Sequence, residues 1–212
     1  MKTIVIGAGG HARVVSSILQ YDANIELVGF IDIVIKVPGE TIHGKPVLGD
    51  HSLLPKLLKE GIRGAIIAVG DNAIREGHFR KLREMGFEMM NAVHPSASVA
   101  NDVVIGRGVV IAAGAVICTH ATIGDNTVIN TGAIVEHENI IGENVHIAPG
   151  VNVAGRTVIK RNTFIGIGST VKDSITIGEN VTVGARAVVL ENIPDNAVAV
   201  GVPAKVVKYK TV

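Results

Sequence analysis

A histidine between two glutamates, Glu136-His137-Glu138, is the segment of this chain best suited to chemistry. A neutral imidazole titrates near neutral pH, so it can take a proton from an attacking amine or hydroxyl. A neighbouring carboxylate fixes the tautomer of the ring and stabilises the imidazolium that forms. The segment therefore indicates a general base for a group transfer in which the acceptor attacks directly.

A glycine-rich turn near the N-terminus indicates a second site. Gly7, Gly9 and Ala12 fit the pattern G-x-G-x-x-G/A between a strand and a helix, where backbone N–H groups can bind a phosphate. Asp32 ends the next expected strand, where such folds hold a ribose hydroxyl. A nucleotide that carries a sugar fits better than NAD, because the second half of a dinucleotide fold is missing. A tight turn without a ligand is the alternative.

The elements that must position these residues follow a period of six. An aliphatic residue recurs at every sixth position, which is the pattern of neither an α-helix nor an alternating strand. A period of six predicts a parallel β-helix, in which each hexapeptide supplies a short strand and a turn, with its Ile or Val inside the shaft. The series is Val93, Val99, Ile105, Ile111, Ile117, Ile123, Ile129, Val135, Ile141, Ile147, Val153, Ile159, Ile165, Val171, Ile177, Val183 and Val189.

The register of this repeat groups the candidate residues. Three hexapeptides make one coil of about 18 residues, so we expect His137 and Gly155 to stack on adjacent coils. His146 is half a coil from His137 and belongs on another face, so one subunit could not easily bring both to the same ligand, whereas a threefold assembly could. Apolar residues expected on the outer faces, which such an assembly would bury, include Val128, Ala133 and Val145.

Some of the histidines are also candidate metal ligands. These are His120, His137 and His146, but their spacings of 17 and 9 residues do not repeat a coil, so we expect no metal. His120 either lines the cleft or is a solvated turn residue. The remaining histidines outside the glycine-rich turn are interpreted as surface residues (His43, His51 and His78) or as structural (His94).

The first ninety residues alternate strands and helices, which predicts a parallel sheet with crossover helices, a half-Rossmann unit. Strands are expected at 3–6, 27–32 and 65–69, and helices at 13–20, 53–59 and 74–85. We therefore expect a Rossmann-like lobe at 1–91, a β-helix at 92–192 and a C-terminal tail at 193–212.

Composition excludes several classes of protein. A net charge of +1 and 3% aromatic residues leave no basic or stacking surface for nucleic acid. No apolar stretch is long enough to span a bilayer. The single cysteine, Cys118, excludes an internal disulfide. Because the first strand runs straight into the glycine-rich turn, we expect no signal peptide. We expect a reduced, cytoplasmic protein.

Three features together resemble one enzyme family: the G-A-G-G-H turn at 7–11, the hexapeptide repeats, and the C-terminal segment Gly201-Val202-Pro203-Ala204-Lys205. The sharpest likeness is in segment 129–138, INTGAIVEHE. The chain is similar to the sialic acid O-acetyltransferases and the sugar-nucleotide N-acetyltransferases of the bacillosamine and perosamine pathways. The resemblance implies a left-handed β-helix, a homotrimer, and acetyl-CoA bound in the groove between neighbouring helices. It also implies that the N-terminal lobe holds the nucleotide of the acceptor.

The resemblance implies a role for single residues. His137 matches the catalytic base, and Glu138 matches the carboxylate that orients it. Asn130 matches a residue of the acceptor site, His146 a histidine near the acetyl group, and Gly155 a glycine whose N–H faces the thioester carbonyl. Positions around the nucleotide sugar are matched by Gly9, Gly10, His11, Asp32, Gly70 and Asn72.

We therefore expect an enzyme of glycan biosynthesis that moves acetyl from acetyl-CoA to the amino group of a UDP-linked 4-amino-4,6-dideoxy sugar. GDP- and dTDP-linked sugars stay open as acceptors. O-acetylation of sialic acid, free or CMP-linked, is the alternative. A non-catalytic nucleotide-binding scaffold is a further one.

Overall fold

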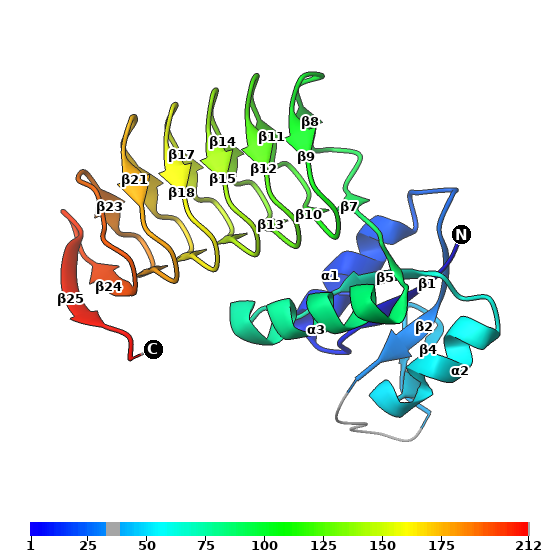
Figure 1. Ribbon diagram of the computed structural model, residues 1–212. Helices are drawn as coiled ribbons and strands as arrows, with labels where there is room; N and C mark the ends of the chain where they lie inside the picture. Colours follow the sequence, from blue (N-terminus) through cyan, green and yellow to red (C-terminus); the bar gives the residue numbers. More distant parts are fainter. Residues whose placement is uncertain (33–38, 212) are drawn as a thin grey trace. The chain divides into compact units, whose positions relative to one another are not determined.

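The computed structural model describes residues 1–32 and 39–211. The chain divides into two compact units, Met1–Pro95 and Ser96–Val212, and each is described by itself (Figure 1). Val212, the last residue of the expected tail, lies outside the described residues.

The first unit is a sheet with the strand order β3-β4-β2-β1-β5-β6. Its strands are β1 (Lys2–Ile6), β2 (Glu26–Ile31), β3 (Thr41–Ile42), β4 (Lys45–Gly49), β5 (Gly64–Ile67) and β6 (Glu88–Met89). Its helices are α1 (Gly10–Leu19), the 3₁₀ turn η1 (His51–Leu53), α2 (Leu54–Lys59) and α3 (Asn72–Met85). The central strand β1 pairs parallel with β2 and β5, which confirms the half-Rossmann arrangement. The sequence did not predict β6 or the antiparallel hairpin of β3 and β4.

Burial explains why the central strands form. Ile4, Val5 and Ile6 of β1 are at most 1% exposed, as are Ile66 and Ile67 of β5. Parallel strands covered on both faces read as continuous apolar runs in this way. The carboxyl ends of β1, β2 and β5 then lie together at one edge of the sheet, and the loops that follow them meet there.

The second unit is a left-handed parallel β-helix in which every strand from β8 to β23 is two residues long. Val110 pairs with Val128, so one coil contains 18 residues. Within the second unit, the β10 sheet contains β10 (Val110–Ile111), β13 (Val128–Ile129), β16 (His146–Ile147), β19 (Phe164–Ile165), β22 (Thr182–Val183), β24 (Ala197–Val200) and β25 (Lys205–Tyr209). The β8 sheet comprises β8 (Ser98–Val99), β11 (Val116–Ile117), β14 (Ile134–Val135), β17 (Asn152–Val153), β20 (Thr170–Val171) and β23 (Val188–Val189). The β9 sheet comprises β9 (Val104–Ile105), β12 (Thr122–Ile123), β15 (Ile140–Ile141), β18 (Val158–Ile159) and β21 (Thr176–Ile177).

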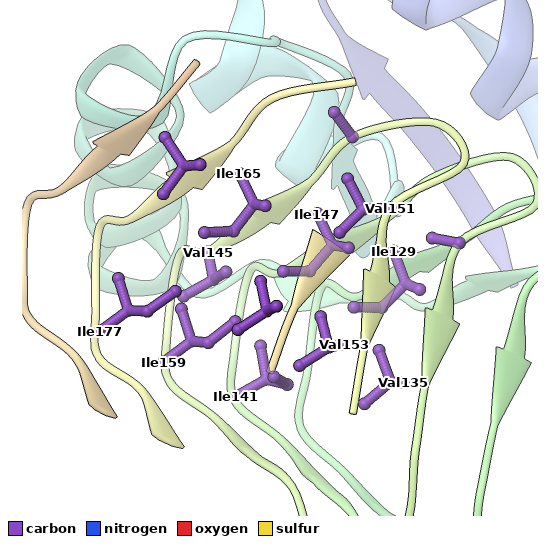
Figure 2. Packing of buried hydrophobic residues seen from close by; sticks show 14 of the residues in the cluster. Ile129, Val135, Ile141, Val145, Ile147, Val151, Val153, Ile159, Ile165 and Ile177 are labelled. Carbon is purple, nitrogen blue, oxygen red and sulfur yellow. The ribbon is translucent and has the colours of Figure 1, made fainter. Parts of the chain in front are cut away.

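The period of six fills the shaft as predicted for most of its length. From Ile111 to Val189 every sixth residue is at most 1% exposed, and Figure 2 shows these side chains converging inside the coils. The start of the series is a correction. Val93, in β7 (Ala92–Val93), is 44% exposed and belongs to the first unit. Val99 and Ile105 are only partly buried, because the first coil has no preceding coil to cover it.

The corners between sheets form three columns of left-handed backbone. One column has glycine at its first position, Gly108, and asparagine at the five positions that follow, and a second has glycine at all but its last, Arg186. Both residue types tolerate a positive φ. The Asn column consists of Gly108 followed by Asn126, Asn144, Asn162, Asn180 and Asn196, and the Gly column begins with Gly114, Gly132, Gly150 and Gly168. The third, here called the His120 column, consists of His120, Glu138, Arg156 and Ser174.

The expectation that three apolar residues lie exposed on the outer faces is wrong. Val128, Ala133 and Val145 are at most 1% exposed within the single chain, so no partner is needed to bury them. The large apolar side chains exposed on the β9 sheet are instead Val104 and Ile140, at 63% and 52%. The C-terminal segment adds β24 and the antiparallel β25 to the β10 sheet. In the described part of the chain, no helix has the length and hydropathy needed to cross a membrane.

Candidate active site

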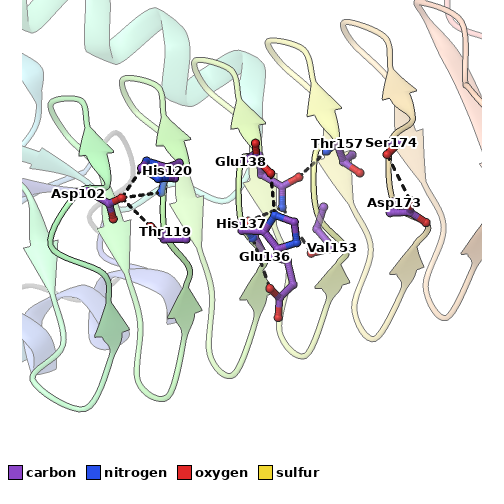
Figure 3. A network of polar contacts seen from close by, with 11 residues as sticks. Asp102, Thr119, His120, Glu136, His137, Glu138, Val153, Thr157, Asp173 and Ser174 are labelled. Carbon is purple, nitrogen blue, oxygen red and sulfur yellow. Dashed lines mark hydrogen bonds and ion pairs between the residues drawn. The ribbon is translucent and has the colours of Figure 1, made fainter.

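His137 and Glu138 occupy the corner that follows β14 (Figure 3). Nδ1 of His137 lies 3.0 Å from Oε2 of Glu138. When Nδ1 donates its proton to this carboxylate, Nε2 keeps a lone pair and can act as the base. The two side chains are 43% and 52% exposed, so a substrate can reach them.

The corner is fixed from inside the shaft by Asn139, which the sequence analysis missed. Its side chain is fully buried. Nδ2 donates to the carbonyl oxygen of Glu136 at 2.8 Å, and Oδ1 accepts from the N–H of Thr157 at 2.7 Å. A buried amide bonded in this way ties the backbone beside His137 to the next coil. The only sequence signal was an amide directly after the Glu-His-Glu segment.

Gly155 stacks on His137, as the 18-residue register predicts. A Cβ atom added at Gly155 would lie 2.6 Å from Cε1 and 2.7 Å from Nε2 of the imidazole. The backbone N–H of Arg156 donates to the carbonyl oxygen of His137 at 3.0 Å, which joins the two coils. The position of the His137 ring therefore requires glycine at 155, independently of any role of the Gly155 N–H in binding the thioester.

His146 lies on a different sheet from the one that ends at His137. It begins β16 of the β10 sheet and is 7% exposed. Nε2 of His146 is 3.2 Å from Nδ2 of Asn130, and its ring meets Phe164 edge to face at 5.2 Å. These three residues begin a groove of about 430 Å³ that continues to Thr182 and Ala185. The groove thus joins Asn130 and His146, which the resemblance assigned to different substrates.

The first unit contains a cavity of about 320 Å³ at the carboxyl edge of its sheet. It is lined by five of the six residues expected around the nucleotide sugar, Gly9, Gly10, His11, Asp32 and Gly70. Oδ2 of Asp32 accepts from the N–H of Ala8 at 2.6 Å and so fixes the glycine-rich turn. Asn72 is not part of this lining, and its Oδ1 accepts instead from the guanidinium of Arg75 at 2.8 Å.

His11 faces this cavity as a neutral imidazole. Burial lowers its pKa to about 4, and the nearby Arg75 acts in the same direction. A neutral ring has one donor and one acceptor nitrogen, so it can bind a hydroxyl or an amine.

Arg75, on α3, is a second residue that the sequence analysis missed. It is 1% exposed. Its guanidinium donates to the carbonyl oxygens of Val69 and Gly70 at 3.3 and 3.2 Å. Burial lowers its pKa to about 10, so the group stays charged at neutral pH. Arg75 thus holds the loop between β5 and α3 that closes the cavity.

The interpretation of His51 and His78 as surface residues is wrong. Both are partly buried and line the cavity, with ring centroids 4.7 Å apart. Burial lowers the pKa of each ring, as does the charge of Lys81, while Asp32 opposes the shift. No sequence pattern indicates this pair, because loops from separate strands bring the two rings together.

Other candidates have a structural explanation. Burial, and then Glu136, raise the pKa of the Cys118 thiol, so the thiol stays protonated and is a poor nucleophile. His94 meets Tyr21 edge to face at 5.3 Å. Within residues 1–32 and 39–211, no three His, Cys, Asp or Glu side chains are grouped to hold a metal ion.

Comparison with known proteins identifies both units. Residues 2–82 match the family of the PglD N-terminal domain, and residues 156–191 match the bacterial transferase hexapeptide family. The chain is 34% identical over 119 residues to UDP-N-acetylbacillosamine N-acetyltransferase of Bacillus subtilis (strain 168). That match covers 53% of this chain and 52% of the relative, so the chain spans about half the length of the curated relative it matches.

Solved structures extend the likeness to nearly the whole chain. A mutant of perosamine N-acetyltransferase from Caulobacter crescentus, in complex with CoA and GDP-perosamine, is 38% identical with a TM-score of 0.92, covering 97% of this chain and 96% of that one. The acetyltransferase domain of PglB from Neisseria gonorrhoeae FA1090, in complex with acetyl coenzyme A, is 32% identical with a TM-score of 0.87, covering 97% and 98%. These matches confirm the resemblance and the fold expected from the sequence. The chain belongs to the hexapeptide-repeat sugar N-acetyltransferases that carry a PglD-type N-terminal domain.

Proposed function

We propose that the protein transfers acetyl from acetyl-CoA to the amino group of a nucleotide-linked amino sugar. The observation that carries the proposal is the His137–Glu138 pair, 3.0 Å apart on an exposed corner against Gly155. Sugar N-acetyltransferases with this fold are among the relatives. They also favour transfer to nitrogen over the O-acetylation and scaffold alternatives.

The chemistry needs no covalent intermediate on the enzyme. The amine nitrogen of the sugar attacks the thioester carbonyl carbon, and Nε2 of His137 takes a proton from that nitrogen. The tetrahedral intermediate then collapses, the carbon–sulfur bond breaks, and the proton passes to the departing CoA thiolate. The products are the N-acetyl sugar and CoA with a free thiol. Glu138 stabilises the imidazolium during the transfer.

The groove along the β10 sheet is proposed to bind acetyl-CoA. Its walls, between Asn130 and Ala185, are mostly apolar side chains and backbone, which suits an extended pantetheine arm. His146 would lie near the acetyl group at one end of this groove. The N–H of Gly155 would face the carbonyl oxygen, where an N–H donor stabilises the developing charge.

The cavity of the first unit is proposed to bind the nucleotide. Gly9 is the N-cap of α1, so the positive end of this helix faces the cavity that Gly9 and Gly10 line. That end suits the diphosphate, and Asp32 suits a ribose hydroxyl. Relatives in UDP- and GDP-sugar biochemistry are both similar to this chain, so the sequence-based expectation of UDP stays a prediction.

We further propose that the active site forms between subunits of a homotrimer. His137 follows a strand of the β8 sheet, and His146 lies on the β10 sheet. A threefold axis along the shaft would set one subunit's His137 beside the groove of its neighbour. The exposed Val104 and Ile140 supply apolar surface for such an interface. A cytoplasmic location, expected from the single cysteine, also stays a prediction.

Turnover tests the function. CoA release, followed with 5,5′-dithiobis-nitrobenzoate, is expected with acetyl-CoA and a UDP- or GDP-linked 4-amino-4,6-dideoxy sugar. His137→Ala should lower kcat by about 10²–10⁴, the usual contribution of a positioned general base. Thermal unfolding and size-exclusion chromatography check that the variant folds and assembles like the wild type. Full activity of a folded His137→Ala variant, or no turnover of any nucleotide amino sugar, would refute the proposal.

A further inference from the structure

A second histidine–carboxylate cluster lies one coil before His137 (Figure 3). Oδ2 of Asp102 accepts from the hydroxyl of Thr119 at 2.6 Å, from the backbone N–H of His120 at 3.2 Å, and lies 2.9 Å from Nδ1 of His120. The side chain of His120 is 71% exposed. With Nδ1–H donated to Asp102, Nε2 of His120 is an acceptor that faces solvent from a fixed ring.

This cluster is joined to the catalytic corner by the backbone. The N–H of Glu138 donates to the carbonyl oxygen of Thr119 at 3.0 Å. His120 and Glu138 are 18 residues apart and occupy successive positions of the His120 column. Successive coils are one interstrand spacing apart, about 4.8 Å. The ring of His120 therefore lies at a level next to that of His137.

The backbone at His120 points to a role for its side chain. His120 has a φ of 58°, which is unfavourable for most side chains. At the corresponding corners the Asn column has Gly108 and then asparagine from Asn126 to Asn196. The His120 column instead has histidine, glutamate, arginine and serine. A non-glycine residue held in this region is often found where the side chain does chemistry or binding.

The donor groove determines on which side of His137 the acceptor lies. The groove begins at Asn130 and His146 and continues through Phe164 to Thr182 and Ala185, toward the C-terminal coils. A threefold axis along the shaft keeps the coils of neighbouring subunits level. The donor then occupies the side of His137 that leads to Gly155 and beyond. The acceptor must approach from the opposite side, over the coil of Thr119 and His120.

We infer that His120, held by Asp102, binds a hydroxyl of the acceptor sugar ring and thereby helps to select the sugar. The inference rests on the proposed function. The hydroxyl donates to Nε2 of His120, while the sugar's amine faces Nε2 of His137. Asp102 acts as a positioning residue, because its carboxylate is taken up by Thr119 and His120. His120 takes no part in the proton transfer.

Steady-state kinetics of the full-length protein test this inference. His120→Asn is the informative change, because asparagine tolerates the corner backbone and leaves the fold intact. We expect its KM for the nucleotide amino sugar to rise about tenfold, the loss of one hydrogen bond. Its KM for acetyl-CoA should not change. Asp102→Asn should shift the same KM by less. Asp173→Asn and Ser174→Ala, on the other side of His137, are matched controls, and neither should change the KM for the nucleotide amino sugar.

The outcomes separate this inference from the proposed function. An unchanged acceptor KM in His120→Asn overturns the inference and leaves the function intact. A lower kcat with both KM values unchanged also overturns it, because His120 would then act on His137 and not on the acceptor. An equal rise in both KM values would point to a general disturbance of the site and would overturn the inference as well. If the wild type turns over no nucleotide amino sugar, the proposed function fails, and the inference falls with it.

Discussion

Gly155→Ala tests whether catalysis depends on the exact position of the His137 ring, because it should displace the ring and leave the other groups of the site in place. The new Cβ would lie 2.6 Å from Cε1 of the imidazole, whereas carbon atoms in contact are about 3.5–4.0 Å apart. The ring must therefore move by about 1 Å. Gly155 does not have a positive φ, so alanine fits its backbone conformation. The ring of His137 is half-exposed and can rotate away from the new methyl group. We expect little change in stability.

The expected loss is in catalysis. A displacement of about 1 Å in a reacting group can lower the rate about 10²-fold. We therefore expect kcat of Gly155→Ala to fall by about 10², with both KM values within about twofold of wild type. The backbone N–H of residue 155 is kept in this variant. CoA release measures kcat, and denaturant unfolding measures stability.

A double-mutant cycle identifies the cause of the loss. If Gly155→Ala acts through the ring, it should have almost no further effect in the His137→Ala background. Gly77→Ala on α3, where a Cβ meets no atom within 4 Å, is the control for a glycine change in itself. Wild-type kcat in Gly155→Ala would refute the packing argument. A full 10²-fold loss in the His137→Ala background would show that the N–H of residue 155, and not the ring, was disturbed.

Two further predictions concern the first unit. The pKa of His11 is about 4 in the folded state and about 6.5 when unfolded, so between these values the unfolded state binds more protons and the free energy of unfolding should fall as the pH falls, by about 3 kcal/mol at most. Denaturant unfolding from pH 7 to pH 4.5 should show this slope, and it should be flatter in His11→Asn. Arg75→Met should destabilise the unit by about 1–3 kcal/mol and raise the KM for the nucleotide sugar, because the carbonyl groups of Val69 and Gly70 lose their donor. The KM for acetyl-CoA should stay the same, and equal changes in both KM values would contradict this role.

The shaft and its register were predictable because they are encoded locally. Each coil repeats the same requirement, a β-branched residue inside and a turn residue at the corner. From 18 residues per coil, the stacking of His137 on Gly155 followed by counting. The half-Rossmann unit was predictable for a similar reason, since buried parallel strands such as β1 are continuous apolar runs.

The cavity of the first unit was only half predictable. Gly9, Gly10 and Asp32 belong to a motif with fixed spacing, so their place could be read from the sequence. His51 and His78 come from separate loops, and only the folded sheet brings their rings within 4.7 Å. Arg75 lies on a helix whose apolar pattern gives no reason to bury a charge. Its burial depends on carbonyl groups of a neighbouring loop, which no periodicity records.

The last prediction is that Glu138 lowers the stability of the fold at its corner, and the free energy of unfolding of a variant can measure this effect. Glu138 has a φ of 59°, at a corner of the kind that the Asn column fills with asparagine. The left-handed conformation costs an ordinary residue about 1–2 kcal/mol, while the exposed pair with His137 contributes less than about 1 kcal/mol. Glu138→Asn should therefore be at least as stable as the wild type in denaturant unfolding, although its kcat falls about tenfold. Ser174→Asn, two coils further along the same column, should gain stability with unchanged kcat. If Glu138→Asn lost both stability and activity, the carboxylate would be part of the scaffold, and the strain at this corner would not be the cost of holding His137.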